Sequence, residues 1–505
     1  MSLTLTQIEA LLGALPAAEA ARCGEAVVRR VVADSRQVQP GDLYAAIPGA
    51  KADGHDFAAE AVRRGAAALL VQRDLPLPVA QLQVRRVRAV LGPVAAAVLG
   101  DPGARLPLVG ITGTNGKTTT TLLLVAALSA AGTPSAAIGT LGAQLSGAGV
   151  TLRRPSLLTT PEAPQLHELL RWAVDEGARA GVLEASSIAL DQGRLDGLRF
   201  TLAVHLGLEA EHLDFHGTIE QYYASKALLF APARTEAAVV RVDDEWGVRL
   251  AAQAQVPLVT FGYSPAADVR LGGVRSGLSG TQVSLSGRDG LLRLEIPLLG
   301  RVNAVNAAAA YLAARHLGLS RQQAAEGLAA VEQPEGRHRL VLGDGSPLVV
   351  VDYAHTPGAL HELIATARGL ACPGGRVVLV FGGRGERARA KRADLGRVAG
   401  EADLVVLTSD SCEVEDLGAV LDEYRLGLMS TATPVLVEHD RREAIALALA
   451  RCRQGDVVLV AGRGHETRLT VDGTTHVFDD RVVAQELLAE RASRRGGAPV
   501  LQRTG

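Results

Sequence analysis

The glycine-rich segment at residues 110–120, G-I-T-G-T-N-G-K-T-T-T, constrains the fold more than any other feature of the sequence. An apolar run at 106–111 precedes it and predicts a buried strand, and an apolar segment at 121–128 follows it and predicts a helix. A glycine-rich turn between a strand and a helix is typical of a phosphate-binding loop, because its backbone N–H groups and the helix N-terminus attract phosphate oxygens. Lys117 is then expected to reach the outer phosphates of a nucleotide, and the Thr118 hydroxyl to hold Mg²⁺.

The spacing of this segment differs from the common G-x-x-x-x-G-K-T form, because Gly110 lies one residue too far from Gly116. The alternative is a glycine-rich turn that merely starts a helix. The lysine and threonine that follow the last glycine favour the phosphate-binding interpretation.

Length and composition predict a globular protein of about three domains. The chain has 505 residues, of which 48% are hydrophobic, and its net charge of −2 argues against nucleic acid as the main partner. The four cysteines, Cys23, Cys372, Cys412 and Cys452, form no C-x-x-C pair and fit a reducing compartment rather than a disulfide framework or a zinc site. The N-terminus does not resemble a signal peptide and no apolar stretch is long enough to span a membrane, so we expect a cytoplasmic protein.

We expect the three domains at residues 1–104, 105–334 and 335–505. The first should contain strands at 27–33, 43–47 and 66–71 and helices at 6–15, 58–65 and 87–99. The second should contain strands at 107–111, 180–185, 202–206, 237–242 and 257–261 and helices near 118–131, 163–176, 219–230 and 303–316. This alternation of strands and helices indicates a mainly parallel sheet, and the alternating residues at 268–297 predict a small antiparallel patch on it.

The third domain should hold a second doubly wound sheet, because four apolar strands recur in it with helices between them. The predicted strands lie at 348–352, 377–381, 404–408 and 457–461. Each is followed by a polar cluster, at 352–355, 382–384, 409–410 and 462–466. Ligands of such sheets bind at the carboxyl ends of the strands, so these clusters predict a binding site.

Three residues of the second domain are candidates for a metal site beside Thr118. Glu184 ends a predicted strand, His212 lies in the polar segment that follows another, and Lys226 lies on a predicted helix. Each also has a structural alternative. Glu184 could be a solvated or capping residue, His212 an ordinary core or surface histidine, and Lys226 a lysine whose aliphatic part covers apolar surface.

Taken together, these motifs resemble those of the Mur ligases, ATP-dependent enzymes that form amide bonds in peptidoglycan precursor synthesis. The resemblance is strongest to the MurE type, which adds the third residue of the stem peptide to UDP-N-acetylmuramoyl-L-Ala-D-Glu. It extends over nearly the whole chain, through the segments 34–43, 113–119, 158–162, 186–187, 192–194, 300–306, 336–337, 352–357, 462–466 and 478–481. The last two segments are the ones most particular to the MurE type.

The resemblance implies an α/β protein of three domains, which would bind the UDP substrate, ATP and the amino acid in that order along the chain. The central domain would hold a mainly parallel sheet of the P-loop type with a small antiparallel patch, and the C-terminal domain a Rossmann-like doubly wound sheet. ATP and Mg²⁺ would be the cofactors, and UDP-N-acetylmuramoyl-dipeptide and a diamino acid the substrates. No nucleic acid or membrane partner is implied, and we expect a monomer.

The family's site residues can be transferred to matching positions. The resemblance implies that Lys117, Glu184, His212 and Lys226 are catalytic, and that Thr118, Glu184, His212 and a carbamylated Lys226 bind metal. ATP would contact Gly113, Thr114, Asn115, Gly116, Lys117, Thr118, Thr119, Asn303, Arg337 and Asp352. The UDP substrate would contact Ser35, Thr159, Thr160, Ser186, Gln192 and Arg194, and the amino acid would contact Arg387, Asp410, Ser411, Glu413, Gly462 and Glu466. ATP would bridge two domains, so closure is expected to assemble the site.

Several positions depart from the family pattern. Ile188 stands where relatives usually have histidine, Gly207 where they have asparagine, Glu211 where they have aspartate, and Ala388 where aspartate is common. None of these changes affects the four residues implied to be catalytic, so we expect activity to survive.

The most informative departure is the sequence D-S-C-E at residues 410–413. Family members that use meso-diaminopimelate typically have D-N-P-R, in which the arginine pairs with the distal carboxylate of the amino acid. Glu413 would repel that carboxylate and attract an ammonium, which leads to the hypothesis that the amino acid is L-lysine or L-ornithine. Glu413 and Glu466 would then form an acidic pocket, and Arg387 would bind the α-carboxylate. The alternative is a shifted loop in which a nearby arginine compensates and meso-diaminopimelate is used.

Two other functions are alternatives to a MurE-type ligase. A folylpolyglutamate-synthase-like ligase would share the ATP chemistry, but it would lack the uridine-type segment at residues 34–36. A catalytically silent nucleotide-binding regulator would not need Lys117, Glu184, His212 and Lys226.

Overall fold

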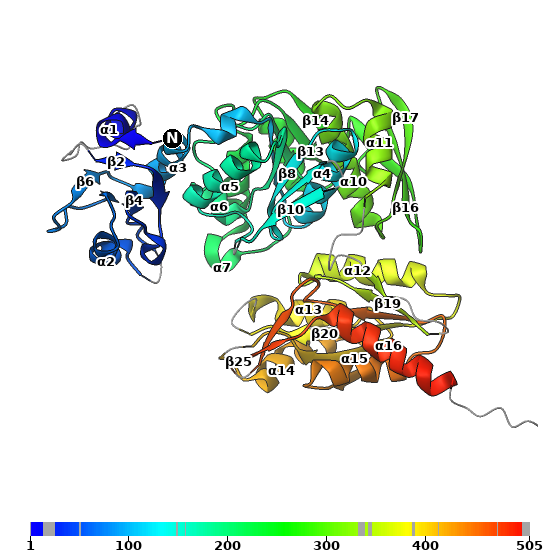
Figure 1. Ribbon diagram of the computed structural model, residues 1–505. Helices are drawn as coiled ribbons and strands as arrows, with labels where there is room; N and C mark the ends of the chain where they lie inside the picture. The colour runs from blue at the N-terminus through cyan, green and yellow to red at the C-terminus, as the bar shows by residue number, and fades with distance from the viewer. Residues whose placement is uncertain are drawn as a thin grey trace, which may run out of the picture. The chain divides into compact units, whose positions relative to one another are not determined.

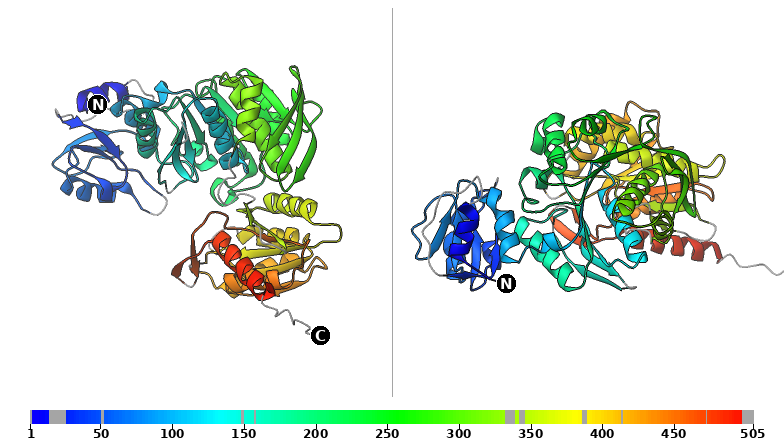
Figure 2. Two further views of the ribbon diagram at one scale, coloured as in Figure 1. Left: turned by 45° about the vertical axis from the view of Figure 1, so that its right-hand side comes forward. Right: turned by 90° about the horizontal axis from the view of Figure 1, so that it is seen from above.

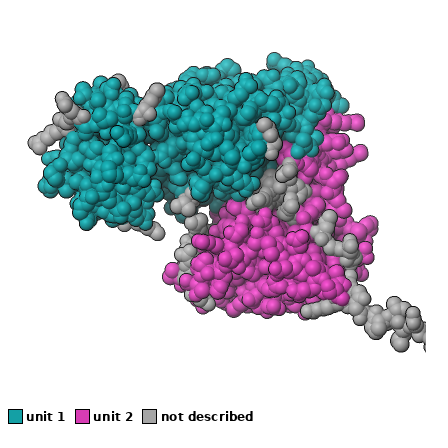
Figure 3. Space-filling model, in the orientation of Figure 1, with its two compact units in different colours: residues 1–272, 285–292, 305–330 teal, residues 273–284, 293–304, 331–505 magenta. Residues whose placement is uncertain are grey.

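The computed structural model describes residues 2–13, 26–49, 52–147, 150–156, 158–331, 339–341, 346–385, 389–412, 414–471 and 473–496. The chain divides into two compact units (Figure 3). Unit 1 comprises Met1–Gly272, Leu285–Leu292 and Val305–Ala330, and unit 2 comprises Gly273–Ser284, Arg293–Ala304 and Val331–Gly505. Arg337, Arg387, Ala388 and Glu413 lie outside the described residues.

The N-terminal part of unit 1 is built on a parallel sheet in the order β3-β4-β5-β6 (Figure 1, blue). The strands are β3 (Arg30–Val32), β4 (Asp42–Ala45), β5 (Ala68–Val71) and β6 (Ala80–Gln83), and the helices α1 (Leu5–Gly13), α2 (Ala58–Arg63) and α3 (Val87–Val98) accompany them. β1 (Leu3–Thr4) pairs with β2 (Val27–Val28) in a separate ladder. The strands predicted at 43–47 and 66–71 are present, but the one predicted at 27–33 is divided into β2 and β3, which belong to different sheets. Strand β6 was not predicted, because its sequence A-Q-L-Q has a single large apolar residue.

The central sheet has eleven strands within the described residues, in the order β10-β9-β8-β11-β7-β12-β13-β14-β15-β16-β17. Their bounds are β7 (Leu108–Thr112), β8 (Ser135–Gly139), β9 (Gly142–Gly147), β10 (Val150–Arg154), β11 (Ala180–Glu184), β12 (Leu202–His205), β13 (Ala238–Arg241), β14 (Leu258–Gly262), β15 (Val269–Gly277), β16 (Gly280–Gly287) and β17 (Gly290–Ile296). From β8 to β15 all neighbours are parallel. Two-residue turns join β15 to β16 and β16 to β17. Such short turns can connect only antiparallel neighbours, so these three strands form the predicted antiparallel patch.

The helices of this region agree with the predicted ones and add several. They are α4 (Lys117–Ala130), α5 (Ala163–Asp175), α6 (Ser187–Asp191), α7 (Leu213–His216), α8 (Ile219–Ala227), α9 (Glu245–Gln253), α10 (Arg301–His316) and α11 (Arg321–Ala329). The helix expected at 219–230 ends as an α-helix at Ala227 and continues as a 3-10 turn at Leu228–Phe230.

The C-terminal part of unit 2 is a six-stranded sheet within the described residues, in the order β18-β19-β23-β20-β21-β22. The strands are β18 (Arg339–Val341), β19 (Leu348–Val351), β20 (Val377–Gly383), β21 (Leu404–Ser409), β22 (Val435–Val437) and β23 (Val457–Val460), and all neighbours except β18 and β19 are parallel. A separate hairpin consists of β24 (Arg468–Val471) and β25 (Thr474–Val477).

Helices cover both faces of this sheet, as the prediction of a doubly wound fold requires. Helices α12 (Pro357–Leu370), α13 (Arg392–Ala399) and α14 (Leu417–Leu428) share one apolar core with the sheet, and α15 (Arg441–Ala450) and α16 (Asp480–Gly496) share the other. Helix α16 is the red helix in Figures 1 and 2. The α/β class, with a mainly parallel central sheet and a doubly wound C-terminal sheet, is therefore confirmed. Among the described residues no helix combines the length and apolarity needed to cross a membrane.

Candidate active site

The glycine-rich segment has the geometry of a phosphate-binding loop. Buried strand β7 leads into Gly113 (φ +152°) and Gly116 (φ +86°), and α4 begins at Lys117. A Cβ on Gly116 would lie 2.3 Å from the Asn306 side-chain oxygen, so both the backbone angle and the space require glycine there. The irregular glycine spacing has therefore not prevented the strand, turn and helix from forming in the expected order.

The first two residues of α4 point toward different groups. Lys117 Nζ donates to the carbonyl oxygens of Gly113 at 2.8 Å and Thr114 at 3.0 Å, so its side chain folds back over the loop. The Thr118 hydroxyl donates to Glu184 Oε2 at 2.9 Å. A cation and a carboxylate therefore lie at the same helix N-terminus, as a nucleotide–metal site needs.

Glu184 is a buried carboxylate with specific partners, so it is not the solvated residue that its sequence position allowed. It ends β11 and is 2% exposed. Besides Thr118, it accepts the Thr140 backbone N–H at 2.9 Å and the Thr140 hydroxyl at 3.1 Å. Thr140, which follows β8, was not among the predicted residues. Nothing in its local sequence marks it, because its role depends on β8 lying beside β11 in the sheet.

Lys226 is fully enclosed and does not extend to the surface. It lies on α8, is 2% exposed and donates from Nζ to the Gly113 carbonyl at 3.0 Å. Burial and the nearby Lys117 ammonium hold the pKa of Lys226 well below its usual value of 10.5. A lowered pKa favours the unprotonated amine, which is the form that can react with CO₂.

This depressed pKa predicts how stability depends on pH. Between the folded pKa of Lys226 and 10.5, the unfolded chain holds a proton that the folded chain lacks, so raising the pH stabilises the fold. In CO₂-free buffer the free energy of unfolding of the wild type should rise relative to that of Lys226→Met, by up to about 1.4 kcal/mol per pH unit. Urea denaturation of both proteins at several pH values measures this difference. A difference that stays constant with pH would contradict the depressed pKa.

His212 lies at the start of α7, the short helix that precedes α8 in the chain. It caps α7 with a left-handed backbone (φ +55°), and its ring centroid is 6.2 Å from that of Tyr222 on α8. Within the described part of the chain, no three His, Cys, Asp or Glu side chains already stand close enough together to hold a metal ion. A neighbouring histidine, His216, lies deeper, with Nε2 at 3.0 Å from the Ser187 hydroxyl, and sequence reasoning gave it no role.

Most residues expected to bind the UDP substrate converge on Glu184. The Thr160 hydroxyl donates to the Glu184 carbonyl at 2.6 Å and to Ser186 Oγ at 3.1 Å, and the Thr159 hydroxyl lies 3.2 Å from that of Thr140. Arg194 donates to the Thr160 carbonyl at 2.9 Å. The phosphate-binding loop therefore contacts the carboxylate of Glu184, and this group contacts its backbone carbonyl and its partner Thr140.

The other residues expected to bind the UDP substrate have separate hydrogen-bond and ion-pair partners. Arg194 also donates to Gln192 Oε1 at 2.7 Å and forms an ion pair with Glu162 at 3.2 Å. Arg88, on α3 of the N-terminal part, forms a second ion pair with Glu162 at 3.1 Å. Ser35 lies elsewhere, with its hydroxyl bonded to Glu60 at 3.2 Å. Neither Arg88 nor Glu162 was predicted, because an ion pair between residues so far apart in the chain leaves no local pattern.

In unit 2, the residues expected to bind the amino acid follow the ends of β21 and β23. Asp410 Oδ1 accepts the Ser411 N–H at 2.7 Å and lies 3.3 Å from Arg463 Nη1. Glu466 accepts Arg384 Nη2 at 3.0 Å and lies 3.7 Å from Arg463. Burial opposes charge on Arg384, but the carboxylates of Asp410 and Glu466 raise its pKa above the usual value.

Two of the residues expected to contact ATP lie among the described residues of unit 2, and each is hydrogen-bonded to a nearby backbone group. Asp352 follows β19 and accepts the Ala354 N–H at 2.7 Å, and Asn303 donates from its side chain to the Leu299 carbonyl at 2.7 Å. Both side chains are buried. Arg337, the third, lies outside the described residues.

Comparison with known protein families agrees with this arrangement. The chain matches the Mur ligase middle domain at residues 111–314, the Mur ligase glutamate ligase domain at 336–464 and the Mur ligase family catalytic domain at 27–99. The chain therefore belongs to the Mur ligase family.

Similar proteins within the family indicate which type of Mur ligase the chain is. The chain is 41% identical over 481 residues to the UDP-N-acetylmuramoyl-L-alanyl-D-glutamate–2,6-diaminopimelate ligase of Solibacter usitatus, covering 94% of this chain and 96% of that protein. It is also 41% identical to the ligase of the same name from Gloeobacter violaceus, over 91% of this chain and 94% of that protein. A solved structure of a ligase with this name has a TM-score of 0.68 and 30% identity, covering 97% of this chain and 100% of that one. Within the family the chain is of the MurE type, an ATP-dependent enzyme that forms an amide bond.

Proposed function

We propose that this enzyme joins a diamino acid to the D-Glu side chain of UDP-N-acetylmuramoyl-L-Ala-D-Glu, using ATP and Mg²⁺. The observation that carries the proposal is the position of Glu184. On one side it accepts the hydroxyl of Thr118, from the phosphate-binding loop. On the other side its backbone and its partner Thr140 contact Thr160 and Thr159, from the substrate-binding group. A nucleotide phosphate and a substrate carboxylate would thus be bound next to each other.

The proposed chemistry has two steps. The D-Glu carboxylate attacks the γ-phosphorus of ATP, which forms an acyl phosphate and releases ADP. The amine of the diamino acid then attacks the acyl carbon, and phosphate leaves. Because both steps gather negative charge, cations must stabilise them, and Lys117, whose ammonium lies over the loop at the Gly113 carbonyl, would do so at the outer phosphates.

The groups around Thr118 fit a bound Mg²⁺. This ion prefers oxygen ligands, and the Thr118 and Thr140 hydroxyls lie at 2.9 Å and 3.1 Å from the same carboxylate oxygen of Glu184. When bound there, Mg²⁺ would neutralise phosphate charge. We further propose that Lys226 is carbamylated: its unprotonated amine attacks the carbon of CO₂, an N–C bond forms and one proton leaves to water. The carbamate, together with His212, would add ligands for a second ion.

For the amino acid, the relatives support a diaminopimelate such as the meso form, because their names specify 2,6-diaminopimelate as the acceptor. The geometry of unit 2 agrees with this choice. Arg384 and Arg463 both lie within 4 Å of Glu466. These two guanidinium groups are candidates for the compensating cation that a distal carboxylate would need. They also neutralise part of the negative charge that an acidic pocket around Glu466 would have.

A second candidate, L-lysine or L-ornithine, is favoured by one specific observation. Glu413 stands where the resemblance places the arginine that pairs with the distal carboxylate. A carboxylate at that position favours an amino acid that ends in an ammonium group.

An incorporation assay with meso-diaminopimelate, L-lysine and L-ornithine in parallel decides between the two candidates. If the relatives are the better guide, meso-diaminopimelate gives the highest kcat/KM. Preference for lysine or ornithine would instead support the role given to Glu413. In that case Glu413→Arg should shift preference toward meso-diaminopimelate by about tenfold or more. Val414→Arg is the matched control, because it adds the same cation one residue away on a side chain that is 86% exposed.

A phosphate-release assay with the same substrates tests the proposed function as a whole. Phosphate release should depend on both the UDP-muramoyl-dipeptide and the amino acid. Release that neither substrate stimulates would overturn the proposal.

A further inference from the structure

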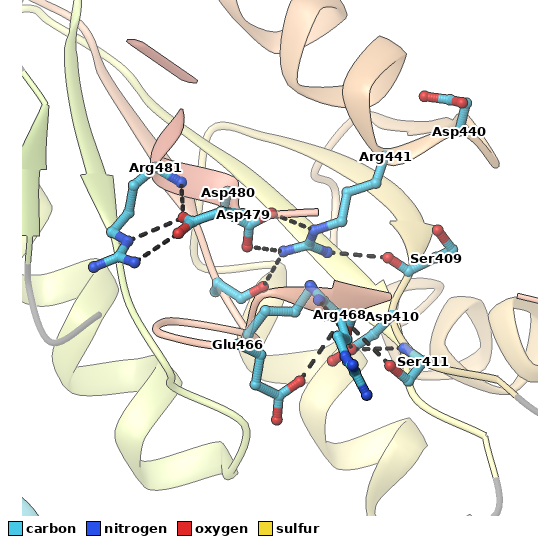
Figure 4. A network of polar contacts seen from close by, with 12 residues as sticks. Ser409, Asp410, Ser411, Asp440, Arg441, Glu466, Arg468, Asp479, Asp480 and Arg481 are labelled. Atoms are coloured by element: carbon cyan, nitrogen blue, oxygen red, sulfur yellow. Dashed lines mark hydrogen bonds and ion pairs between the residues drawn. The ribbon is translucent and has the colours of Figure 1, made fainter. Parts of the chain in front are cut away.

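Arg441, the first residue of α15, is a charged side chain buried completely. It pairs in a two-pronged contact with Asp480, the first residue of α16, with Nε to Oδ1 at 2.7 Å and Nη2 to Oδ2 at 2.8 Å (Figure 4). Neither side chain has any exposed surface. Neither residue was assigned a role from the sequence.

The outer donors of Arg441 hold the ends of two strands. Nη1 donates to the carbonyl of Ser409, the last residue of β21, at 3.1 Å, and Nη2 donates to the carbonyl of Ala461, which follows β23, at 3.0 Å. Strand β20 lies between β21 and β23 in the sheet. A Cβ on Gly382 of β20 would come within 2.9 Å of Nη1, so the guanidinium also lies against this middle strand.

Each of the two carbonyls stands directly before proposed amino-acid-binding residues. Ser409 precedes Asp410 and Ser411, and Ala461 precedes Gly462. A second buried arginine, Arg463, links the same two turns through side chains, because its Nη1 lies 3.3 Å from both Asp410 Oδ1 and Ser411 Oγ. The turns are therefore joined twice, through backbone carbonyls by Arg441 and through side chains by Arg463.

We infer that Arg441, oriented by Asp480, is a positioning residue that sets the separation of the two turns that bind the amino acid. The inference rests on the proposed function, because that function assigns the amino acid to these turns. Only a planar guanidinium can satisfy a carboxylate along one edge while its outer N–H groups reach two carbonyls. A lysine ammonium keeps the charge but cannot hold all these acceptors in one plane.

The simpler alternative is that Arg441 only joins α15 to α16. The next residue provides a matched control for that role. Arg442 joins the same two helices from the surface, through Glu486 at 2.6 Å and Glu490 at 3.1 Å, and it touches neither turn. If joining the helices were the whole role of Arg441, Arg441→Lys and Arg442→Lys would affect the amino-acid site equally.

Steady-state kinetics on the full chain test the inference. Arg441→Lys should raise the KM for the preferred diamino acid by about 10- to 100-fold, while the KM values for ATP and UDP-muramoyl-dipeptide change by less than about twofold. Asp480→Asn, which keeps the shape and removes the charge, should act in the same direction. Arg442→Lys should leave all three KM values unchanged. Equal amino-acid KM values in Arg441→Lys and Arg442→Lys would overturn the inference.

Amide hydrogen exchange on the substrate-free protein separates this inference from the proposed function. Arg441→Lys should speed exchange in the turns at 409–412 and 461–464 more than Arg442→Lys does. Unchanged exchange in both turns would overturn the positioning role, whichever substrates the enzyme accepts. A wild type that ligates none of the three diamino acids would overturn the proposed function alone.

Discussion

Replacing Lys117 with methionine is expected to lower kcat/KM for ligation by about 10³-fold. Methionine keeps most of the side chain's length but removes the cation that we propose meets the outer phosphates. The loss should appear in kcat as well as in KM, because the charge it neutralises grows in the transition state. Steady-state ligation with saturating UDP-muramoyl-dipeptide measures the effect.

The control for Lys117→Met is binding of the UDP substrate in the absence of nucleotide. The hydrogen bonds of Thr159, Thr160 and Arg194 do not involve Lys117, so this binding should stay within about twofold of wild type. Ligation at a normal rate in the variant would remove the phosphate-binding loop from the mechanism.

Glu184→Gln should lower kcat/KM by about 10²- to 10³-fold and raise the Mg²⁺ concentration needed for half-maximal rate. Glutamine has nearly the same shape, but it has one carbonyl oxygen in place of two charged ones. In the wild type one carboxylate oxygen accepts the Thr118 hydroxyl and the other accepts the Thr140 N–H. Titrating Mg²⁺ at fixed ATP separates the loss of metal affinity from the loss of rate.

Glu162→Gln is a useful comparison for Glu184→Gln. Glu162 pairs with Arg88 and Arg194, so its loss should weaken binding of the UDP substrate without changing the Mg²⁺ requirement. An identical Mg²⁺ dependence in wild type and Glu184→Gln would rule out a role for Glu184 at the metal.

Much of the fold could be predicted from periodicity, because the strands around the binding loops are runs of valine and leucine. Strands β7, β20, β21 and β23 were found where expected. The segment that forms β8 to β10, at residues 135–154, was missed. Its first strand reads S-A-A-I-G, which is rich in small residues of low strand propensity. Its pairing with β11 in the sheet, rather than the strand propensity of its residues, makes this segment a strand.

Single residues of the candidate site could be proposed from the sequence, but their assembly could not. Lys117 and Thr118 follow from the loop itself, Glu184 and Lys226 from their places after a strand and on a helix, and Thr160 from the family resemblance. The sequence did not show that the phosphate-binding loop and the substrate-binding threonines would both contact Glu184. One of these links runs through Thr140, which follows β8, a strand that was not predicted. Arg384 and Arg463 lie in predicted polar clusters, but Arg441 was missed, since its partners are remote in the chain.

The single carbonyl of Gly113 has a consequence for the order of events during assembly of the site. Lys117 and Lys226 both donate to it, and the charge of Lys117 adds to burial in lowering the pKa of Lys226. When phosphate anions bind Lys117, this repulsion is screened, so by thermodynamic linkage nucleotide binding and proton uptake by Lys226 favour each other. A protonated amine cannot capture CO₂. If Lys226 is carbamylated as proposed, the reaction should therefore be fastest in the nucleotide-free enzyme, before the first turnover.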